Sequence, residues 1–364
     1  MGKREAANIL KVAGVYTASV IGAGFASGQE LVRFFLKHGK LSFAGIILAG
    51  FLFSVLGYIV LDRVFTQRIR NYEEFIFPMV GMFAGRIINI GSTLFTMSVF
   101  CIMIAGSGSI IAELLKIPLH WGVSIAALIC MFVLIADIKG VVALATVITP
   151  VLILGMLAVS IFLLVSKNVQ VFNTEGIIQG ITGNWVLSAL VYVSYNSIMS
   201  IVVLCNLLPY LKTRRTGRLG GILGGIALGI SALLISLALF FFHPEKTGAD
   251  FPLLEVIRPY SAVLSAGYTG ILFLAMLLSA ITAGFCVTEK VSRRLHIRGR
   301  LAAPVICALA VPLSAIGFSK LIGTVYPIFG CIGLFMLIVI LLYGIKELIH
   351  GIRERRYKRL LRKS

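Results

Sequence analysis

The chain has 364 residues, of which 59% are hydrophobic and only 13% are charged, with a mean hydropathy of +1.02. A soluble domain of average composition carries roughly 25% charged residues, so this chain lacks the polar residues that a soluble surface requires. The composition predicts an integral membrane protein. It excludes a sizeable extramembrane domain, and with it most enzymes whose chemistry takes place in water.

A spanning helix needs about 20 apolar residues, and ten segments of sustained apolarity meet or approach that length. We predict spans at residues 9–36, 42–61, 87–115, 119–136, 141–165, 183–210, 219–242, 263–289, 301–317 and 321–345. The predicted fold class is therefore an all-α membrane protein with ten transmembrane helices and short loops.

The distribution of Lys and Arg predicts the orientation. If the N-terminus is cytoplasmic, most of the 33 basic residues fall on the cytoplasmic side, as the positive-inside rule requires. Both termini are then cytoplasmic, and residues 346–364 form a basic tail that fixes topology or attracts anionic lipid. Because membrane topology accounts for the net charge of +19, we expect no nucleic-acid partner.

The second five predicted spans follow the first five at a nearly constant offset. In each half, a short amphipathic segment with a proline separates spans two and three, at residues 72–78 and 250–255. Since five is an odd number, the second half enters the membrane from the opposite side. The pattern predicts two inverted repeats, residues 1–166 and 167–345, as in secondary transporters.

The most unusual stretch of span one is the string Ile21-Gly22-Ala23-Gly24-Phe25-Ala26-Ser27-Gly28-Gln29-Glu30. Each glycine costs about 1 kcal/mol in a helix interior, and an ionised Glu within the membrane costs a few kcal/mol more. An unwound helix that faces a cavity would use both. The alternative is a seam of small residues that lets a neighbouring helix approach closely.

The corresponding span of the second half has a polar cluster at mid-membrane, from Ser194 to Ser197. We expect this helix to be broken as well, although no Gly or Pro marks the position. The alternative is that these side chains form hydrogen bonds between helices.

A ten-span inverted repeat whose first helix contains this glycine-rich string resembles the LeuT-type fold of the amino acid–polyamine–organocation transporters. The string itself resembles the YkvI-type branch of bacterial membrane proteins within that group, which implies a location in a bacterial plasma membrane. The resemblance implies a substrate site between spans one, three, six and eight. By position, its residues are Gly22, Ala23, Gly24, Phe25, Ala26 and Ser27, then Met97, Cys101, Ile104 and Ser107, and finally Tyr192, Tyr195, Asn196 and Ser197.

The resemblance also implies a sodium site, with carbonyls near Gly22 and Phe25 and ligands from Ser279 and Thr282 in span eight. The hydroxyl pair that is frequent in the family falls on Thr282-Ala283, so one hydroxyl is missing. The alternative coupling ion is a proton carried by Glu30. We expect no organic cofactor and no metal other than sodium.

Arg33 follows Glu30 by three residues, so the two can meet on one helical face. We expect Arg33 to act as a gate, or else to extend its side chain to the membrane surface. Sodium-coupled relatives pair a similar arginine with an acid in span ten, but residues 321–345 contain no Asp or Glu.

These features predict a secondary active transporter that moves a small zwitterion or organic cation, such as an amino acid or an amine, by alternating access. The expected partners are this solute and the lipid bilayer. The sequence contains no catalytic dyad or metal cluster at one depth, so we do not expect an enzyme. The alternative is a receptor subunit of the same fold that binds a nutrient without transporting it.

Overall fold

A computed structural model describes residues 3–136, 139–166, 183–242, 250–296 and 299–361, and every regular element in this part of the chain is helical. In chain order the α-helices are α1 (Lys3–Val20), α2 (Ala23–Ala26), α3 (Gln29–Phe34), α4 (Leu41–Gln67), α5 (Tyr72–Leu115), α6 (Leu119–Ala136), α7 (Lys139–Val165), α8 (Trp185–Cys205), α9 (Arg214–Phe242), α10 (Pro252–Ile257), α11 (Ala262–Leu295), α12 (Gly299–Ser314) and α13 (Phe318–Leu361). Two short 3₁₀ helices, Leu36–His38 and Leu208–Tyr210, lie between them.

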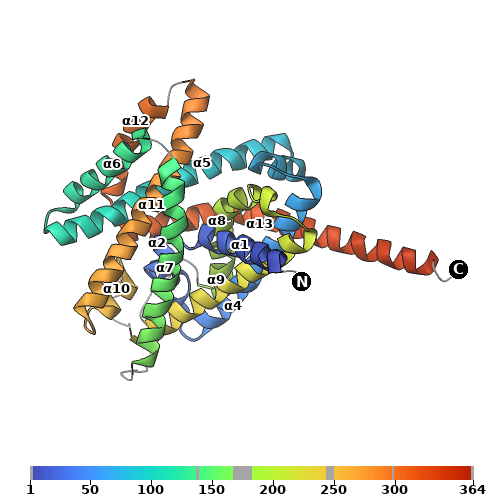
Figure 1. Ribbon diagram of the computed structural model, residues 1–364, viewed down its shortest axis with the longest axis horizontal. Coiled ribbons are helices and arrows are strands. Elements are labelled where there is room, and N and C mark those ends of the chain that lie inside the picture. The colour runs from blue at the N-terminus through green and yellow to red at the C-terminus, as the bar shows by residue number, and fades with distance from the viewer. Residues whose placement is uncertain (1–2, 137–138, 167–182, 243–249, 297–298, 362–364) are drawn as a thin grey trace.

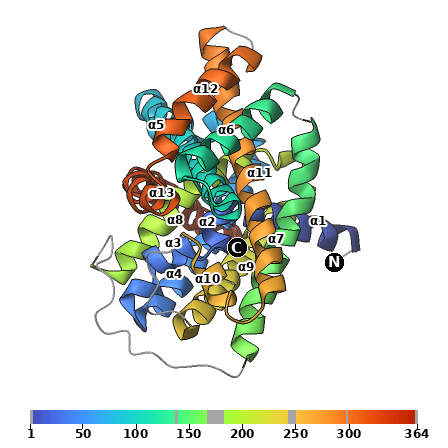
Figure 2. The same cartoon turned by 90° about the vertical axis from the view of Figure 1, so that its left-hand side faces the viewer.

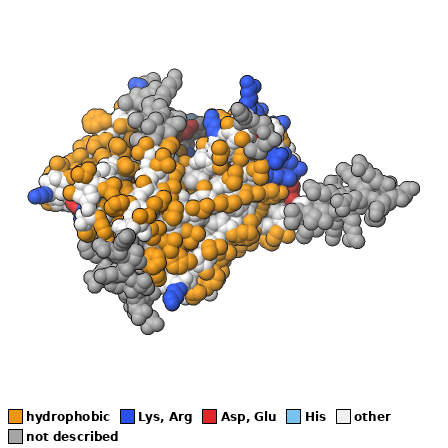
Figure 3. Space-filling model, turned by 60° about the horizontal axis from the view of Figure 1, so that its bottom comes forward, with side chains coloured by type: hydrophobic (Ala, Val, Ile, Leu, Met, Phe, Trp, Pro, Cys, Tyr) orange, Lys and Arg blue, Asp and Glu red, His pale blue; other side chains and the backbone are white. Residues whose placement is uncertain are grey.

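Within the described ranges, six helices are long and apolar enough to cross a membrane, namely α4, α5, α8, α9, α11 and α13. Helices α6 and α12 and the second part of α7 are apolar but shorter. Hydrophobic side chains cover most of the face in Figure 3, and Lys and Arg lie at its margins. The all-helical membrane fold is confirmed, while the count of ten crossings and the division into residues 1–166 and 167–345 stay predictions.

Glycines determine how α4 and α9 pack against each other. A Cβ atom on Gly50 of α4 would lie 2.9 Å from the Cα atom of Gly229 of α9, and one on Gly57 would lie 2.7 Å from the carbonyl oxygen of Gly221. The two backbones therefore approach closely along their length, and α1 lies against α9. Helices α6 and α12 lie together at one end of the molecule, and α4, α9 and α10 at the other (Figures 1 and 2).

The two proline-bearing segments between spans two and three are helical. The first is the beginning of α5, where Asn71 accepts a hydrogen bond from the backbone N–H of Glu74 at 2.9 Å. Gly81 then adopts φ +78°, a conformation that favours glycine, and separates this turn region from the long apolar part of α5. The second segment is α10, which begins at Pro252.

The predicted break in the sixth span is wrong. Helix α8 is continuous across Ser194–Ser197. The Asn196 amide donates to the carbonyl oxygen of Tyr192 at 3.0 Å, and the Ser194 hydroxyl lies 2.8 Å from that of Val191 and 2.5 Å from that of Gly330 in α13. Because these polar groups bond to carbonyls of their own helix or of α13, they do not require unwound backbone, and the alternative of a hydrogen bond between helices is confirmed at Ser194.

Candidate functional site

The first predicted span is broken twice. Helix α1 ends at Val20, and Gly22 adopts an extended conformation before the single turn of α2. A second interruption follows at Gly28, whose φ of +82° suits glycine, and α3 begins at Gln29. The predicted unwinding of this helix is therefore confirmed.

Two neighbouring elements bind the backbone carbonyls that the break exposes. The Tyr268 hydroxyl of α11 donates to the carbonyl oxygen of Ala26 at 2.7 Å. The backbone N–H of Leu253 in α10 donates to that of Ser27 at 3.0 Å. A helix break is stable in a membrane only if its polar groups find such partners. The short helix α10 thus helps to hold the break open.

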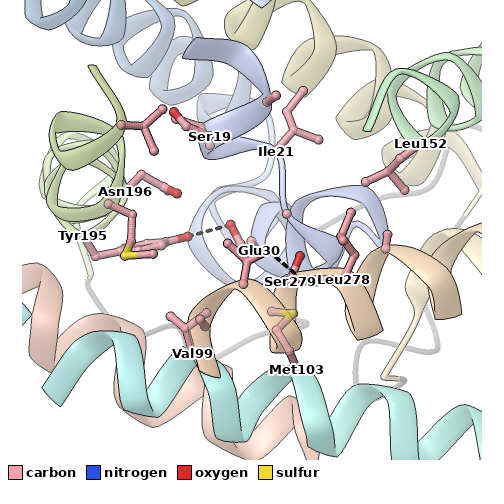
Figure 4. A pocket seen from close by; sticks show the side chains of 18 of the residues that line it. Ser19, Ile21, Glu30, Val99, Met103, Leu152, Tyr195, Asn196, Leu278 and Ser279 are labelled. Atoms are coloured by element: carbon pink, nitrogen blue, oxygen red, sulfur yellow. Dashed lines mark hydrogen bonds between the residues drawn. The ribbon is translucent and has the colours of Figure 1, made fainter. Parts of the chain in front are cut away.

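Glu30 lies in the first turn of α3, directly after the break, and is only 4% exposed. The Tyr195 hydroxyl of α8 donates a hydrogen bond to its Oε2 atom at 2.7 Å (Figure 4). A Cβ atom on Gly24 would lie 2.3 Å from the Oε1 atom, so the carboxylate occupies the space that this glycine leaves. A residue without a side chain is therefore required at position 24 to leave room for the buried carboxylate of Glu30.

A cavity of about 330 Å³ adjoins this carboxylate. Its walls come from α1, α5, α7, α8, α11 and α13, and side chains from these elements converge around Glu30 in Figure 4. Among the described residues that line it, Glu30 carries the one charged side chain, and Ser19, Asn196, Ser279 and Thr282 add polar groups. The rest of the lining is mainly apolar.

The structure brings some of the predicted site residues to this cavity and leaves others outside it. Those that line it are Gly22, Glu30, Tyr195, Asn196, Ser279 and Thr282. Those that are not part of the lining are Ala23, Gly24, Phe25, Ala26, Ser27, Met97, Cys101, Ile104, Ser107, Tyr192 and Ser197. The predicted residues of span one mostly pack in the core, because α2 turns their side chains away from the cavity.

The face that α5 presents to the cavity differs from the predicted one. Phe95, Val99 and Met103 line the cavity, each four residues after the previous one. Cys101 lies on another face, where its carbonyl oxygen accepts a hydrogen bond from Ser314 at 2.8 Å. The rotation of a helix about its axis depends on its neighbours, and the sequence of α5 is apolar on all sides.

Aromatic rings close the cavity on the α3 side. Tyr195 stacks on Tyr326 of α13, with ring centroids 4.5 Å apart, and Tyr192 lies 5.5 Å from Phe34 and 5.0 Å from Phe35. Aromatic pairs at such distances add about 0.5–1.5 kcal/mol each beyond the area they bury. The cavity therefore extends from Glu30 toward α1 and the C-terminal parts of α8 and α11.

A polar cluster lies beyond this aromatic layer. The Ser319 hydroxyl of α13 accepts hydrogen bonds from Gln29 at 2.7 Å and from the Arg33 guanidinium at 2.5 Å. The Ser319 backbone N–H donates to Oδ1 of Asp250 at 3.1 Å, and Ser109 donates to Oδ2 at 3.2 Å. The cluster thus links α3, α5, α13 and the segment before α10.

Sequence reasoning did not find Tyr326, Ser319 or Asp250 as members of the site. Asp250 is the first residue of the proline-bearing segment at residues 250–255, and this position in a segment repeated in both halves was a signal. Tyr326 and Ser319 lie in an apolar helix without any distinguishing motif, and only the packing of α13 against α8 shows where they face.

Comparison with known proteins identifies relatives along most of the chain, although no family model matches it. The chain is 29% identical over 329 residues to the uncharacterized membrane protein YkvI of Bacillus subtilis, covering 89% of this chain and 92% of that protein. The manganese transporter of Eremococcus coleocola is similar in structure, with a TM-score of 0.61 and 16% identity over 93% of this chain and 78% of that one. A Na⁺-coupled sialic acid symporter gives a TM-score of 0.58 and 15% identity over 92% and 78% of the two chains. The chain is thus a membrane protein homologous to YkvI, and its fold is that of the LeuT-fold transporters.

Proposed function

We propose that the protein is a secondary active transporter that carries a small amine-bearing solute through the membrane by alternating access. The observation that carries this proposal is the cavity at the broken first helix, where Tyr195 holds the buried carboxylate of Glu30. The similar structures named above are a manganese transporter and a sialic acid symporter, which supports transport as the function of this fold here.

The proposed topology has ten crossings in two inverted repeats, with both termini in the cytoplasm. In this topology, α1 and the C-terminal parts of α8 and α11 lie toward the cytoplasm, and so does the cavity. Arg33, Ser319 and Asp250 lie toward the opposite side, beyond the aromatic layer. The arrangement corresponds to an inward-facing state whose outer side is closed by the polar cluster.

The charge of the cavity favours a cationic group in the cargo. Glu30 is a carboxylate among mainly apolar walls, and the described lining residues include no Lys, Arg or His. A buried carboxylate is stabilised by a cationic partner, whereas an anionic cargo would be repelled. The proposed cargo is therefore a small amine or zwitterion whose ammonium group binds Glu30 and whose body contacts the apolar wall.

Sodium is the proposed coupling ion, with a proton on Glu30 as the alternative. Gly22, Ser279 and Thr282 line the same cavity, and the Thr282 hydroxyl donates to the carbonyl oxygen of Leu278 at 2.9 Å. This orientation leaves the oxygen lone pairs of Thr282 available to a cation. The carbonyl oxygen of Phe25 instead accepts a hydrogen bond from Gly28 at 3.0 Å.

Counterflow in proteoliposomes tests the proposal. Vesicles loaded with an unlabelled amine or amino acid should accumulate the same labelled compound, and replacing sodium with potassium should abolish the exchange. Glu30→Gln should remove it as well, with Glu113→Gln at an exposed position as the control. Sodium-dependent thermal stabilisation without exchange would contradict transport, and full activity of Glu30→Gln would contradict the role of this carboxylate.

A further inference from the structure

The outer face of the α4–α9 pair bears a groove of about 560 Å³. Its floor contains the small residues Gly50, Ser54 and Gly229, and its walls include Phe51 and Ile230, which are 63% and 53% exposed. The floor is deep because the two helices meet there through glycine backbones. The site differs in place and in lining from the cavity beside Glu30.

On each of the two helices, the residues that line the groove form one stripe along a single face, and this stripe ends at charged residues. On α4 the stripe passes from Ile47 through Ser54 to Tyr58, and Asp62 follows one turn later. On α9 it passes from Leu233 through Ile226 to Ile222, and Arg218 and Arg214 follow at four-residue steps. Residues four apart lie on the same face of a helix, so both apolar stripes end at the same charged cluster.

The charged cluster is joined directly to the groove. The Arg218 guanidinium lies 5.2 Å from the centroid of the Tyr58 ring, which lines the groove. Arg218 and Arg214 both donate to the carboxylate of Asp62, at 2.7 Å and 2.6 Å. Their side chains remain 29% and 49% exposed, so another anion can still reach them.

The cluster carries an uncompensated positive charge. Two guanidinium groups share the single carboxylate of Asp62. Glu347 acts on Arg214 and on Arg63, and Glu5 accepts a hydrogen bond from the Thr213 hydroxyl at 3.3 Å, so two further carboxylates belong to this region. Arg215 and Lys212 are exposed in the same segment, and with Arg63 they leave five basic groups against three carboxylates. Charge complementarity therefore points to an anionic partner at this end.

The length of the groove indicates what kind of molecule fits it. The distance from Ile222 to Leu233 along α9 is about 16 Å at 1.5 Å per residue. One leaflet of the hydrocarbon core, half of the ~30 Å total, has nearly the same thickness. An acyl chain whose headgroup lies at the level of Arg218 would therefore fill the groove.

We propose that this groove is a binding site for an anionic phospholipid, with an acyl chain between α4 and α9 and the phosphodiester beside Arg218 and Arg214. The bound lipid would brace the pair of helices against which α1 packs. The chemistry that recognises it is the combination of an apolar channel and a guanidinium pair, since basic pockets between membrane helices bind anionic headgroups.

Native mass spectrometry of the full chain in detergent tests the proposal. Dioleoyl phosphatidylglycerol and dioleoyl phosphatidylcholine are added at equal concentration, and the lipid retained per chain is counted. The wild type should retain phosphatidylglycerol about fivefold more than phosphatidylcholine, the ratio expected from one net basic charge. Glycerol phosphate without acyl chains should not displace it.

Two variants and two matched controls assign the site. Arg218→Gln leaves Asp62 paired with Arg214 and should reduce phosphatidylglycerol retention to the phosphatidylcholine level. Ile226→Trp, which fills the groove, should do the same. Arg215→Gln removes the same charge as Arg218→Gln, but at an exposed position outside the row of residues that leads to the groove. Leu309→Trp introduces the same indole ring as Ile226→Trp, but at an exposed position on α12. Both control variants should therefore retain the lipid.

Three results would overturn the proposal. One is equal retention of the two lipids by the wild type. Another is an equal loss in Arg215→Gln and Arg218→Gln, which would show only a general attraction of basic residues. The third is a dimer that Ile226→Trp converts to monomers without loss of phosphatidylglycerol, which would make the groove an interface between two copies of the chain.

Discussion

The Tyr195 hydroxyl donates a hydrogen bond to Glu30 across 2.7 Å, and this bond joins the broken first helix to α8. The two residues are 165 positions apart and belong to different predicted repeats. Both are buried, at 2% and 4% exposure, so the bond is protected from water. If α3 and α8 move relative to each other, this hydrogen bond must break; if it persists, the two helices must move together.

The coupling between these two side chains should appear in a double-mutant cycle. A hydrogen bond to a charged group contributes about 1.5–3 kcal/mol, so Tyr195→Phe and Glu30→Gln should each lower the unfolding temperature, and the double variant should lower it by less than their sum. The measurement is thermal unfolding in detergent. Tyr72→Phe, which removes a hydroxyl that bonds to the Sδ atom of Met336, combined with Glu30→Gln is the control and should be additive. Additivity in the Tyr195 cycle would show that the bond does not contribute to the folded state.

Gly24 in the break and Gly14 in α1 should respond differently to an added methyl group. Gly24→Ala places a Cβ atom 2.3 Å from Oε1 of Glu30, so the carboxylate must move. We expect counterflow exchange to fall about tenfold or more, the consequence of losing one charge-assisted contact. Gly14→Ala in α1 is the matched control, because Gly14 lies outside the cavity lining and no atom lies within 4 Å of its added Cβ. Equal activities of the two variants would contradict the role assigned to the position of Glu30.

Ser319 should control how firmly one side of the cavity is closed. Ser319→Ala removes the acceptor shared by Gln29 and Arg33, and each such bond contributes about 1 kcal/mol net. We expect faster hydrogen–deuterium exchange in α3, by roughly fivefold for one such bond. Thr324→Ala is the control, because its hydroxyl bonds only to its own helix, at Lys320. Unchanged exchange in Ser319→Ala would show that this cluster does not hold the closure.

The close glycine contacts between α4 and α9 should contribute to the free energy of unfolding of the protein. Gly57→Ala would bring a Cβ atom within 2.7 Å of both the Gly221 carbonyl oxygen and the Tyr16 ring. Because backbone and a buried ring cannot easily move away, we expect a loss of about 1–3 kcal/mol, measured by thermal unfolding. Gly267→Ala on α11 has open space around its Cβ and should be neutral or stabilising by up to ~1 kcal/mol. A higher unfolding temperature for Gly57→Ala than for Gly267→Ala would contradict this account.

The residues that are unfavourable in a membrane-spanning helix were the most informative part of the sequence. Gly22, Gly24 and Gly28 are unfavourable in a helix interior, and Glu30 is unfavourable in a membrane, so together they predicted the break correctly. The cluster at Ser194–Ser197 misled the prediction for the opposite reason. Serine and asparagine can bond to carbonyls of their own helix or of a neighbouring one, and in α8 they do both without disturbing the helix.

The sequence by itself determined the class of the molecule, because 59% hydrophobic and 13% charged residues permit only a membrane fold. It also determined where the first helix unwinds, since backbone preference is a local property. The rotation of α5 that exposes Phe95 and Val99 was decided only by tertiary structure, as was the meeting of Arg33 with Ser319 and Asp250. In lipid an apolar helix gains little from turning one face rather than another toward its neighbours, so its rotation depends on how side chains from distant segments fit together.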